Sequence, residues 1–167
     1  MRILIFSILL ISMTINAQSN VETIQKEINN TVWKPFQKAF ETLDADALNA
    51  IYAVNVIRVT PQGIDIKNDF KIQNVKRFKD SKKNGAIIIL DFWFDKRDTN
   101  ETTSYEVGFY RIASTINGET SYNYGQFHIV LKKINGNWKI TQDWDTATIN
   151  GHALGKTDFE KQQPIEF

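Results

Sequence analysis

Two residues suited to acid/base chemistry, His128 and Asp143, fall on neighbouring strands that the sequence predicts. The dipeptide Asn135-Gly136 is typical of a two-residue hairpin turn, and such a turn fixes the register of its strands. Counting back from the turn places His128 opposite Asp143, where a carboxylate would orient the imidazole and raise its pKa. The pair can also be a simple cross-strand contact on an outer sheet face. We favour the contact, because no nucleophile is evident beside it, and we assign no catalytic residue.

The same register gives the hairpin a second, mostly apolar face. Its predicted pairs are Leu131–Ile140, Ile129–Gln142 and Phe127–Trp144. Gln142 is the polar exception, and a buried amide without partners costs about 1–3 kcal/mol. Gln142 therefore indicates either a polar spot in the wall of a pocket or a glutamine near the sheet edge that reaches solvent.

A second turn signal, Asn117-Gly118, decides whether Glu106 joins this row. If the turn is tight, Glu106 pairs with Ile129, and Tyr110 lies on the same face. If the loop is longer by one residue, the parity of the strand reverses and both side chains point the other way.

Arg58 is a charged residue inside an apolar strand. It can pair with Glu106 or Asp91, bind an anionic group of a ligand, or extend into water from an edge strand. Four aromatic residues are candidates for a pocket wall, although aromatic side chains also dominate ordinary cores. The predicted ligand-binding residues are Tyr52, Arg58, Trp93, Glu106, Tyr110, Gln142 and Trp144.

The composition argues against several other kinds of site. The chain has no cysteine and two histidines, His128 and His152, and its Asp and Glu residues show no metal-ligand spacing, so we expect no metal site and no cofactor. The formal net charge is +1. A basic run lies between residues 71 and 83, and acidic residues dilute it, so we interpret it as a solvated helix face rather than a nucleic-acid surface. Its cations are Lys71, Lys76, Arg77, Lys79, Lys82 and Lys83.

The hydrophobic pattern changes period along the chain. An apolar stripe between residues 21 and 43 predicts an amphipathic helix, which Pro35 should kink or divide near Thr31. Asp44 is a suitable N-cap for a second helix at 45–53. A third helix is predicted at 69–79 and a charged loop at 96–101. Strands are predicted at 54–60, 86–94, 104–116, 122–134 and 137–145. Helices followed by an antiparallel meander indicate an α+β fold with the helices on one sheet face.

The N-terminus has the layout of a secretory signal peptide. Arg2 precedes an apolar run at residues 3–15, and Ala17 offers a small residue for cleavage. The run is shorter than the roughly 20 residues of a membrane span. We therefore expect a signal peptide at 1–17, a single domain at 18–167, a periplasmic or secreted location, and no stable membrane insertion after cleavage.

In the order and spacing of its elements, the sequence resembles the nuclear transport factor 2-like superfamily, and within it the SnoaL-like exported bacterial proteins of unknown function. Four stretches carry the resemblance: Val32 to Phe36, Leu43 to Leu48, Ile57 to Val59 with Gly63, and Gly136 to Ile140 with Asp143 and Trp144. The resemblance implies a cone-shaped fold of the cystatin-like type, in which a curved antiparallel sheet wraps around an N-terminal helical layer and opens to a pocket. It also implies homodimers formed through the outer sheet face.

The catalytic residues of known members transfer poorly. The first helix offers Trp33, Phe36 and Phe40 where the isomerases carry a tyrosine, and His128 points outward where the dehydratases carry an inner histidine. The first hypothesis is therefore a binding domain for a small, partly apolar molecule. The second is a lyase, isomerase or hydrolase that uses acid/base chemistry, and the third is a non-catalytic interaction protein. If the Asn117-Gly118 turn is tight, four residues share the outer face, where they would form either the exposed apolar patch of an interaction protein or the homodimer interface: Tyr105, Val107, Phe109 and Val130.

Overall fold

The N-terminal helical layer begins the part of the chain that the structure describes. The structure, a computed structural model, describes residues 20–167, and the predicted signal peptide lies outside the described residues. A helix over residues 20–28 continues into a π-helical turn, η1 (Asn29–Trp33), and then into α2 (Lys34–Glu41). The backbone N–H of Lys34 donates to the carbonyl of Asn29, five residues earlier. The irregularity predicted around Pro35 is therefore confirmed as a wide turn, because proline cannot donate to the carbonyl of Thr31.

Four elements follow this layer along the chain, two helices and two strands of the sheet. In α3 (Ala45–Ile51), Asp44 is the predicted N-cap, and its carboxylate accepts the backbone N–H of Ala47 at 2.9 Å. The strand β1 (Tyr52–Thr60) follows directly, and a turn leads to the short strand β2 (Gly63–Asp65). The helix α4 (Asp69–Lys83) comes next and runs one turn further than the pattern predicted. None of the helices between residues 20 and 167 is long and apolar enough to cross a bilayer.

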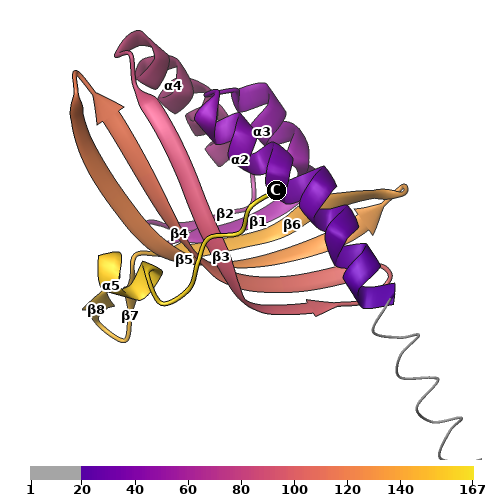
Figure 1. Cartoon of the computed structure of the whole chain (residues 1–167). Helices are drawn as coiled ribbons and strands as arrows, with labels where there is room; N and C mark the ends of the chain where they lie inside the picture. Colours follow the sequence, from indigo (N-terminus) through magenta and orange to yellow (C-terminus); the bar gives the residue numbers. More distant parts are fainter. Residues whose placement is uncertain (1–19) are drawn as a thin grey trace, which may run out of the picture.

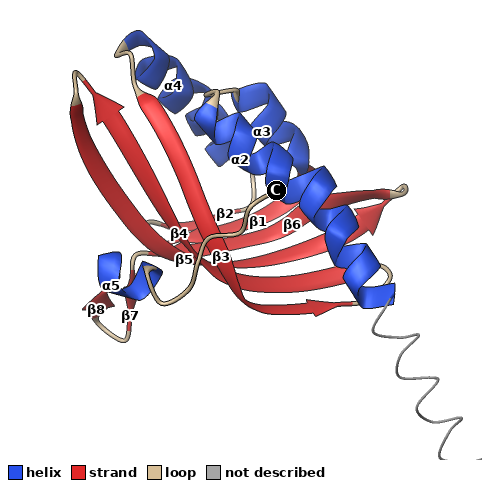
Figure 2. Cartoon of the chain, viewed as in Figure 1, coloured by secondary structure: helices blue, strands red, loops and turns tan. Residues whose placement is uncertain are grey.

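Six strands form one strongly curved, open sheet, and Figure 2 shows the helices α2, α3 and α4 lying across its concave side. Its long strands are β3 (Ile87–Thr99), β4 (Thr103–Ile116), β5 (Glu119–Ile134) and β6 (Asn137–Thr146). The strand order is β2-β1-β6-β5-β4-β3. The predicted α+β cone is confirmed, with one correction: the sheet is mixed, because β1 runs parallel to β6. The loop expected at 96–101 is also largely wrong, because β3 continues to Thr99.

Both predicted hairpin turns are tight. Asn117 and Asn135 take positive φ angles of 54° and 50°, as this turn type requires. Glu106 therefore pairs with Ile129, and Leu131 pairs with Ile140, as the sequence predicted.

Beyond this point the predicted register between β5 and β6 is wrong. The extra residue Thr141 forms a bulge, so that Val130 pairs with Gln142 and Ile129 with Asp143. A one-residue shift moves every later side chain to the other face of the sheet. Gln142 and Trp144 therefore turn to the outer face, while Asp143 turns to the concave face.

The C-terminal segment crosses the outer face and the β3 edge. The short strands β7 (Thr148–Ile149) and β8 (His152–Ala153) lead to α5 (Lys156–Phe159). The indole N–H of Trp93 donates to the carbonyl of Phe159 at 2.7 Å, and the backbone N–H of Ile165 donates to the carbonyl of Phe92 at 2.9 Å. Figure 1 shows this yellow segment passing over β3 toward the helices. The segment therefore covers part of the sheet face that a partner could otherwise use.

Candidate functional site

A cavity of about 150 Å³ lies between the helical layer and the concave face of the sheet. From the helices it is lined by Trp33, Phe36, Phe40 and Leu48. From the sheet it is lined by apolar side chains of β3, β4 and β5: Leu90, Phe92, Ile112, Phe127 and Ile129. An apolar cavity of about this size is large enough for one benzene ring. The cone therefore leaves space for a small apolar group rather than closing on itself.

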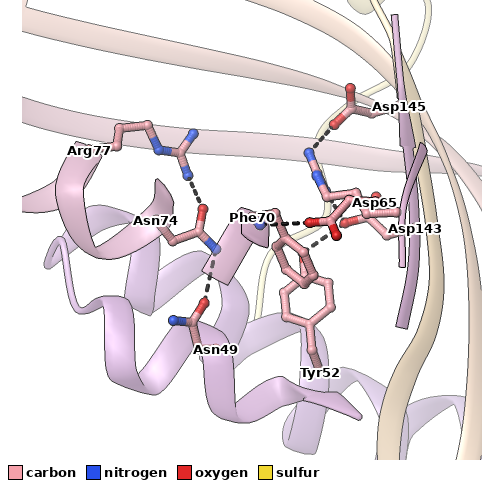
Figure 3. A network of polar contacts seen from close by, with 9 residues as sticks. Asn49, Tyr52, Asp65, Phe70, Asn74, Arg77, Asp143 and Asp145 are labelled. Atoms are coloured by element: carbon pink, nitrogen blue, oxygen red, sulfur yellow. Dashed lines mark hydrogen bonds and ion pairs between the residues drawn. The ribbon is translucent and has the colours of Figure 1, made fainter. Parts of the chain in front are cut away.

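One wall of the cavity is polar and is centred on Asp143. The hydroxyl of Tyr52 donates to Asp143 Oδ2 at 2.8 Å, and Arg58 Nη1 donates to the same oxygen. Arg58 Nη2 reaches Asp145 Oδ2 at 2.5 Å. Figure 3 shows Tyr52, Asp143 and Asp145 converging on this wall. Because β1 and β6 are parallel neighbours with Arg58 opposite Asp143, the sheet itself holds the guanidinium against both carboxylates.

Burial dominates the electrostatics of this wall. It raises the pKa of Asp143, against the opposing effect of the Arg58 charge. Burial, together with the charge of Asp143, raises the pKa of Tyr52 well above its usual value. Burial alone would lower the pKa of Arg58, but the charges of Asp143 and Asp145 outweigh it and raise that pKa. Tyr52 and Arg58 therefore remain donors at neutral pH, and Asp143 is a buried carboxylate that the protein makes easier to protonate.

Tyr110 closes the cavity from β4. A Cβ atom on Gly125 would lie 2.4 Å from the Tyr110 hydroxyl, so this ring position requires glycine on the neighbouring strand. Burial, reinforced by the charge of Asp145, raises the pKa of Tyr110 to about 12. The Tyr110 hydroxyl therefore carries its proton at neutral pH and is available as a donor.

Three of the seven predicted ligand-binding residues line this cavity: Tyr52, Arg58 and Tyr110. Their role in binding stays a prediction. Gln142 and Trp144 lie on the outer face because of the bulge, and Trp93 lies there as well, stacked on Phe109 at 4.6 Å.

Glu106 does face inward, but its side chain lies away from the cavity, in a closed polar cluster. It is fully buried and accepts from Trp33 Nε1 at 2.6 Å, Ser104 Oγ at 2.8 Å and Arg97 Nη2 at 3.0 Å. The expected pairing of Arg58 with Glu106 or Asp91 is wrong, because both carboxylates have another arginine. Asp91 pairs with Arg111 at 2.5 Å.

The predicted pair of His128 and Asp143 is also wrong, because the bulge separates the two side chains onto opposite faces. His128 faces outward, as expected, and its ring packs 4.6 Å from that of Trp144. Its Nδ1 lies 2.5 Å from the hydroxyl of Tyr105. Burial lowers the pKa of His128 rather than raising it. Across residues 20–167 no cluster of His, Asp and Glu could hold a metal ion.

Sequence reasoning missed four polar residues of the cavity: Asn74, Arg77, Asp143 and Asp145. The sequence held only an indirect signal for Asp143. The predicted register put one polar residue, Gln142, on an otherwise apolar face, and shifting that register by one residue moves Gln142 off this face and Asp143 onto it. Arg77 was assigned to the solvated side of α4. Arg77 is indeed exposed, but its guanidinium also lies over the rings of Phe40 and Phe78, at 5.1 and 5.0 Å from their centroids, and lines the cavity.

No protein-family model matches the sequence, and no curated protein matches it. Solved structures do match the fold. An NTF2-like protein with a cystatin-like fold from Novosphingobium aromaticivorans aligns with a TM-score of 0.64 and 9% identity, over 80% of this chain and 88% of that one. An NTF-2 like protein of unknown function from Shewanella oneidensis aligns with a TM-score of 0.60 and 18% identity, over 73% of this chain and 98% of that one.

A third similar structure is a ketosteroid isomerase-like protein from Erwinia carotovora atroseptica, with a TM-score of 0.51 and 13% identity, over 72% of this chain and 95% of that one. These comparisons show that the chain has the nuclear transport factor 2-like fold. Such a fold fits a ligand-binding or a catalytic domain, and the residues of the cavity must decide between them.

Proposed function

We propose that the chain is a binding domain for a small, partly apolar molecule, which enters the cavity between the helical layer and the sheet. The observation that carries this proposal is the cavity itself: an apolar space of about 150 Å³ with charged and hydroxyl groups on one wall. Ligand sites commonly combine an apolar lining with a few polar groups that fix orientation. Here the apolar lining would hold about one ring of the ligand, and the polar wall would hold its functional group.

A cavity-filling variant tests the proposal. The probes are three molecules that share one benzene ring: phenylacetate, phenylacetamide and phenethylamine. We expect at least one of them to bind residues 18–167, measured by NMR titration of backbone amides. Ile112→Trp should weaken that binding at least about tenfold, because the larger side chain occupies the space of the ring. The matched control is Ile89→Trp, since Ile89 is 50% exposed and precedes the cavity-lining Leu90 on β3. If no probe binds, or if both variants bind equally, the cavity is not the site.

We also propose, from the sequence, that the protein is exported and acts as a homodimer. The predicted interface residues Tyr105, Val107, Phe109 and Val130 share the outer face of the sheet, opposite the buried Glu106. The C-terminal segment covers the neighbouring Trp93, so the interface would use the part of the face toward β5 and β6. Native mass spectrometry of the exported protein would report the dimer and any molecule retained in the cavity.

Catalysis is the second candidate, and Asp143 favours it. This carboxylate is 4% exposed, lines the cavity, and has a pKa that burial raises, as expected for a group that exchanges protons with a bound molecule. A lyase, isomerase or hydrolase would convert its substrate under the binding conditions, and Asp143→Asn would abolish the conversion while leaving the cavity intact. Mass spectrometry of the bound molecule before and after incubation separates this candidate from simple binding.

A further inference from the structure

Two side chains in the cavity wall, Tyr110 and Arg77, have N–H or O–H groups that find no acceptor in the described part of the protein. The hydroxyl of Tyr110 makes no hydrogen bond to another residue between 20 and 167, and Arg77 bonds only to Asn74. The two groups lie close enough for the charge of each to affect the pKa of the other. A ligand group that accepts hydrogen bonds would satisfy both.

Contacts on two sides orient the guanidinium of Arg77. Its Cζ lies over the rings of Phe40 and Phe78, and its Nη2 donates to Asn74 Oδ1 at 3.1 Å. The amide of Asn74 in turn donates to Asn49 Oδ1 at 3.0 Å, as Figure 3 shows. A guanidinium has five N–H donors, so these contacts leave several of them available toward the cavity. Cation–π contacts and one anchoring amide orient the side chain without neutralising its charge.

The two arginines of the cavity differ in their partners. Arg58 uses both terminal nitrogens on carboxylates, Asp143 and Asp145. Arg77 has no carboxylate partner in the described part of the chain. Arg77 is exposed to solvent along part of its side chain, but desolvation by its neighbours still lowers the pKa of Arg77, and the charge of Arg58 adds to this effect. Because Arg77 lines the cavity and no carboxylate neutralises its charge, an anion bound in the cavity would gain a charge-assisted hydrogen bond from it.

We infer that the molecule bound in the cavity is a small carboxylic acid, whose carboxylate pairs with Arg77 and accepts from the Tyr110 hydroxyl. This inference rests on the proposed function. A carboxylate matches the planar fork of a guanidinium, whereas a doubly charged phosphate would meet the repulsion of Asp143 and Asp145 in the same wall. A cationic ligand would have to displace Arg58 from those two carboxylates. The body of the acid is about one ring in size, because the apolar space is about 150 Å³.

The three single-ring probes test the charge of the ligand. They differ at the polar end, where phenylacetate carries a carboxylate, phenylacetamide a neutral amide and phenethylamine an ammonium group. We expect phenylacetate to bind about tenfold or more tightly than the other two, since a hydrogen bond to a charged group stabilises more than a neutral one. Arg77→Gln should remove this preference, so that phenylacetate and phenylacetamide bind with similar dissociation constants, because glutamine can still donate a hydrogen bond but carries no charge. Lys79→Gln is the matched control, because it removes one exposed cation from the same helix.

The outcomes separate the two proposals. If phenylacetamide binds as tightly as phenylacetate, or if Arg77→Gln leaves the preference intact, the carboxylic acid inference is wrong while the cavity remains the site. If phenethylamine binds most tightly, the ligand is a cation and the inference is overturned. If none of the three probes binds, the proposed function fails and this inference fails with it. A thermal unfolding curve of each variant confirms that Arg77→Gln remains folded.

Discussion

The concave side of the sheet holds two buried carboxylates that pair with arginines, and only Asp143 lines the cavity. At the closed end, Glu106 accepts three hydrogen bonds, from Trp33, Ser104 and Arg97, and its side chain is fully buried. At the cavity, Asp143 accepts from Tyr52 and Arg58, and the same wall carries donors that lack acceptors. In the first cluster every donor that reaches Glu106 comes from the protein, and only Arg97 Nε is left without a partner among the described residues, whereas the second cluster faces a cavity that the proposed ligand would fill.

The difference shows that a buried charge is by itself weak evidence for function. Structural ion pairs and active sites both bury carboxylates, so the presence of such a pair does not separate them. What separates these two is the space beside them: the Glu106 cluster fills its surroundings, and the Asp143 wall faces a cavity. The sequence prediction combined Glu106 with Gln142 in one site. In the structure Glu106 lies in a buried structural cluster, Gln142 lies on the outer face, and other polar residues line the cavity.

The largest expected effect comes from the closed cluster. Glu106→Gln should lower the free energy of unfolding by about 3–5 kcal/mol, because it leaves Arg97 buried without its carboxylate. Urea denaturation measures this loss, and Glu101→Gln in the exposed β3–β4 turn is the matched control. Probe binding in the cavity should be unchanged in the folded fraction. A Glu106→Gln variant with normal stability would break the distinction between the two carboxylates.

A smaller effect is expected at the cavity. Asp143→Asn should lower the free energy of unfolding by only about 1 kcal/mol at pH 7, because Asp145 still pairs with Arg58 and the new amide oxygen can accept from Tyr52. The same urea experiment applies, with Asp95→Asn on the exposed part of β3 as the control. A loss as large as that of Glu106→Gln would mean that Asp143 is a structural group and would argue against a site on this wall.

Local signals in the sequence were sufficient for most of the fold. The apolar stripe, the Asp44 cap and the two Asn-Gly turns each act within a few residues, and each appears in the structure as predicted. The placement of Glu106 on the inner face also followed from a tight turn. These features depend on backbone geometry next to the residue, so no knowledge of distant contacts was needed.

The missed parts depend on contacts between distant segments. The bulge at Thr141 lies where β6 also pairs with β1, about 85 residues away along the chain, and no local pattern reports that parallel pairing. Arg77 resembles its neighbouring lysines in sequence, and only the position of Phe40 decides that its side chain packs on aromatic rings. Asp143, Asp145 and Arg77 were therefore not predictable from periodicity alone, whereas Tyr52, Arg58 and Tyr110 were among the predicted residues that line the cavity.

The smallest effect is a pH dependence that distinguishes the buried Asp143 from an ordinary surface carboxylate. Arg58, Tyr52 and Asp145 face Asp143, and burial raises its pKa above the unfolded value near 3.8. A raised carboxyl pKa adds stability that is present below about pH 3.8 and is lost as the pH rises through the folded pKa. The stability of the wild type relative to Asp143→Asn should therefore increase as the pH falls from 7.

Asp158 provides the control of opposite sign. Hydrogen bonds from His152, the backbone of Gly155 and Lys161 lower the pKa of Asp158 to about 2, so its contribution is present above about pH 3.8 and is lost as the pH falls toward 2. Between pH 7 and pH 3, thermal unfolding should show the stability of the wild type rising relative to that of Asp143→Asn. Over the same range, the stability difference between the wild type and Asp158→Asn should become smaller. If both differences shrink together, the carboxylate of Asp143 is stabilised in its charged form by its partners, as that of Asp158 is, and the cavity wall does not favour the protonated acid.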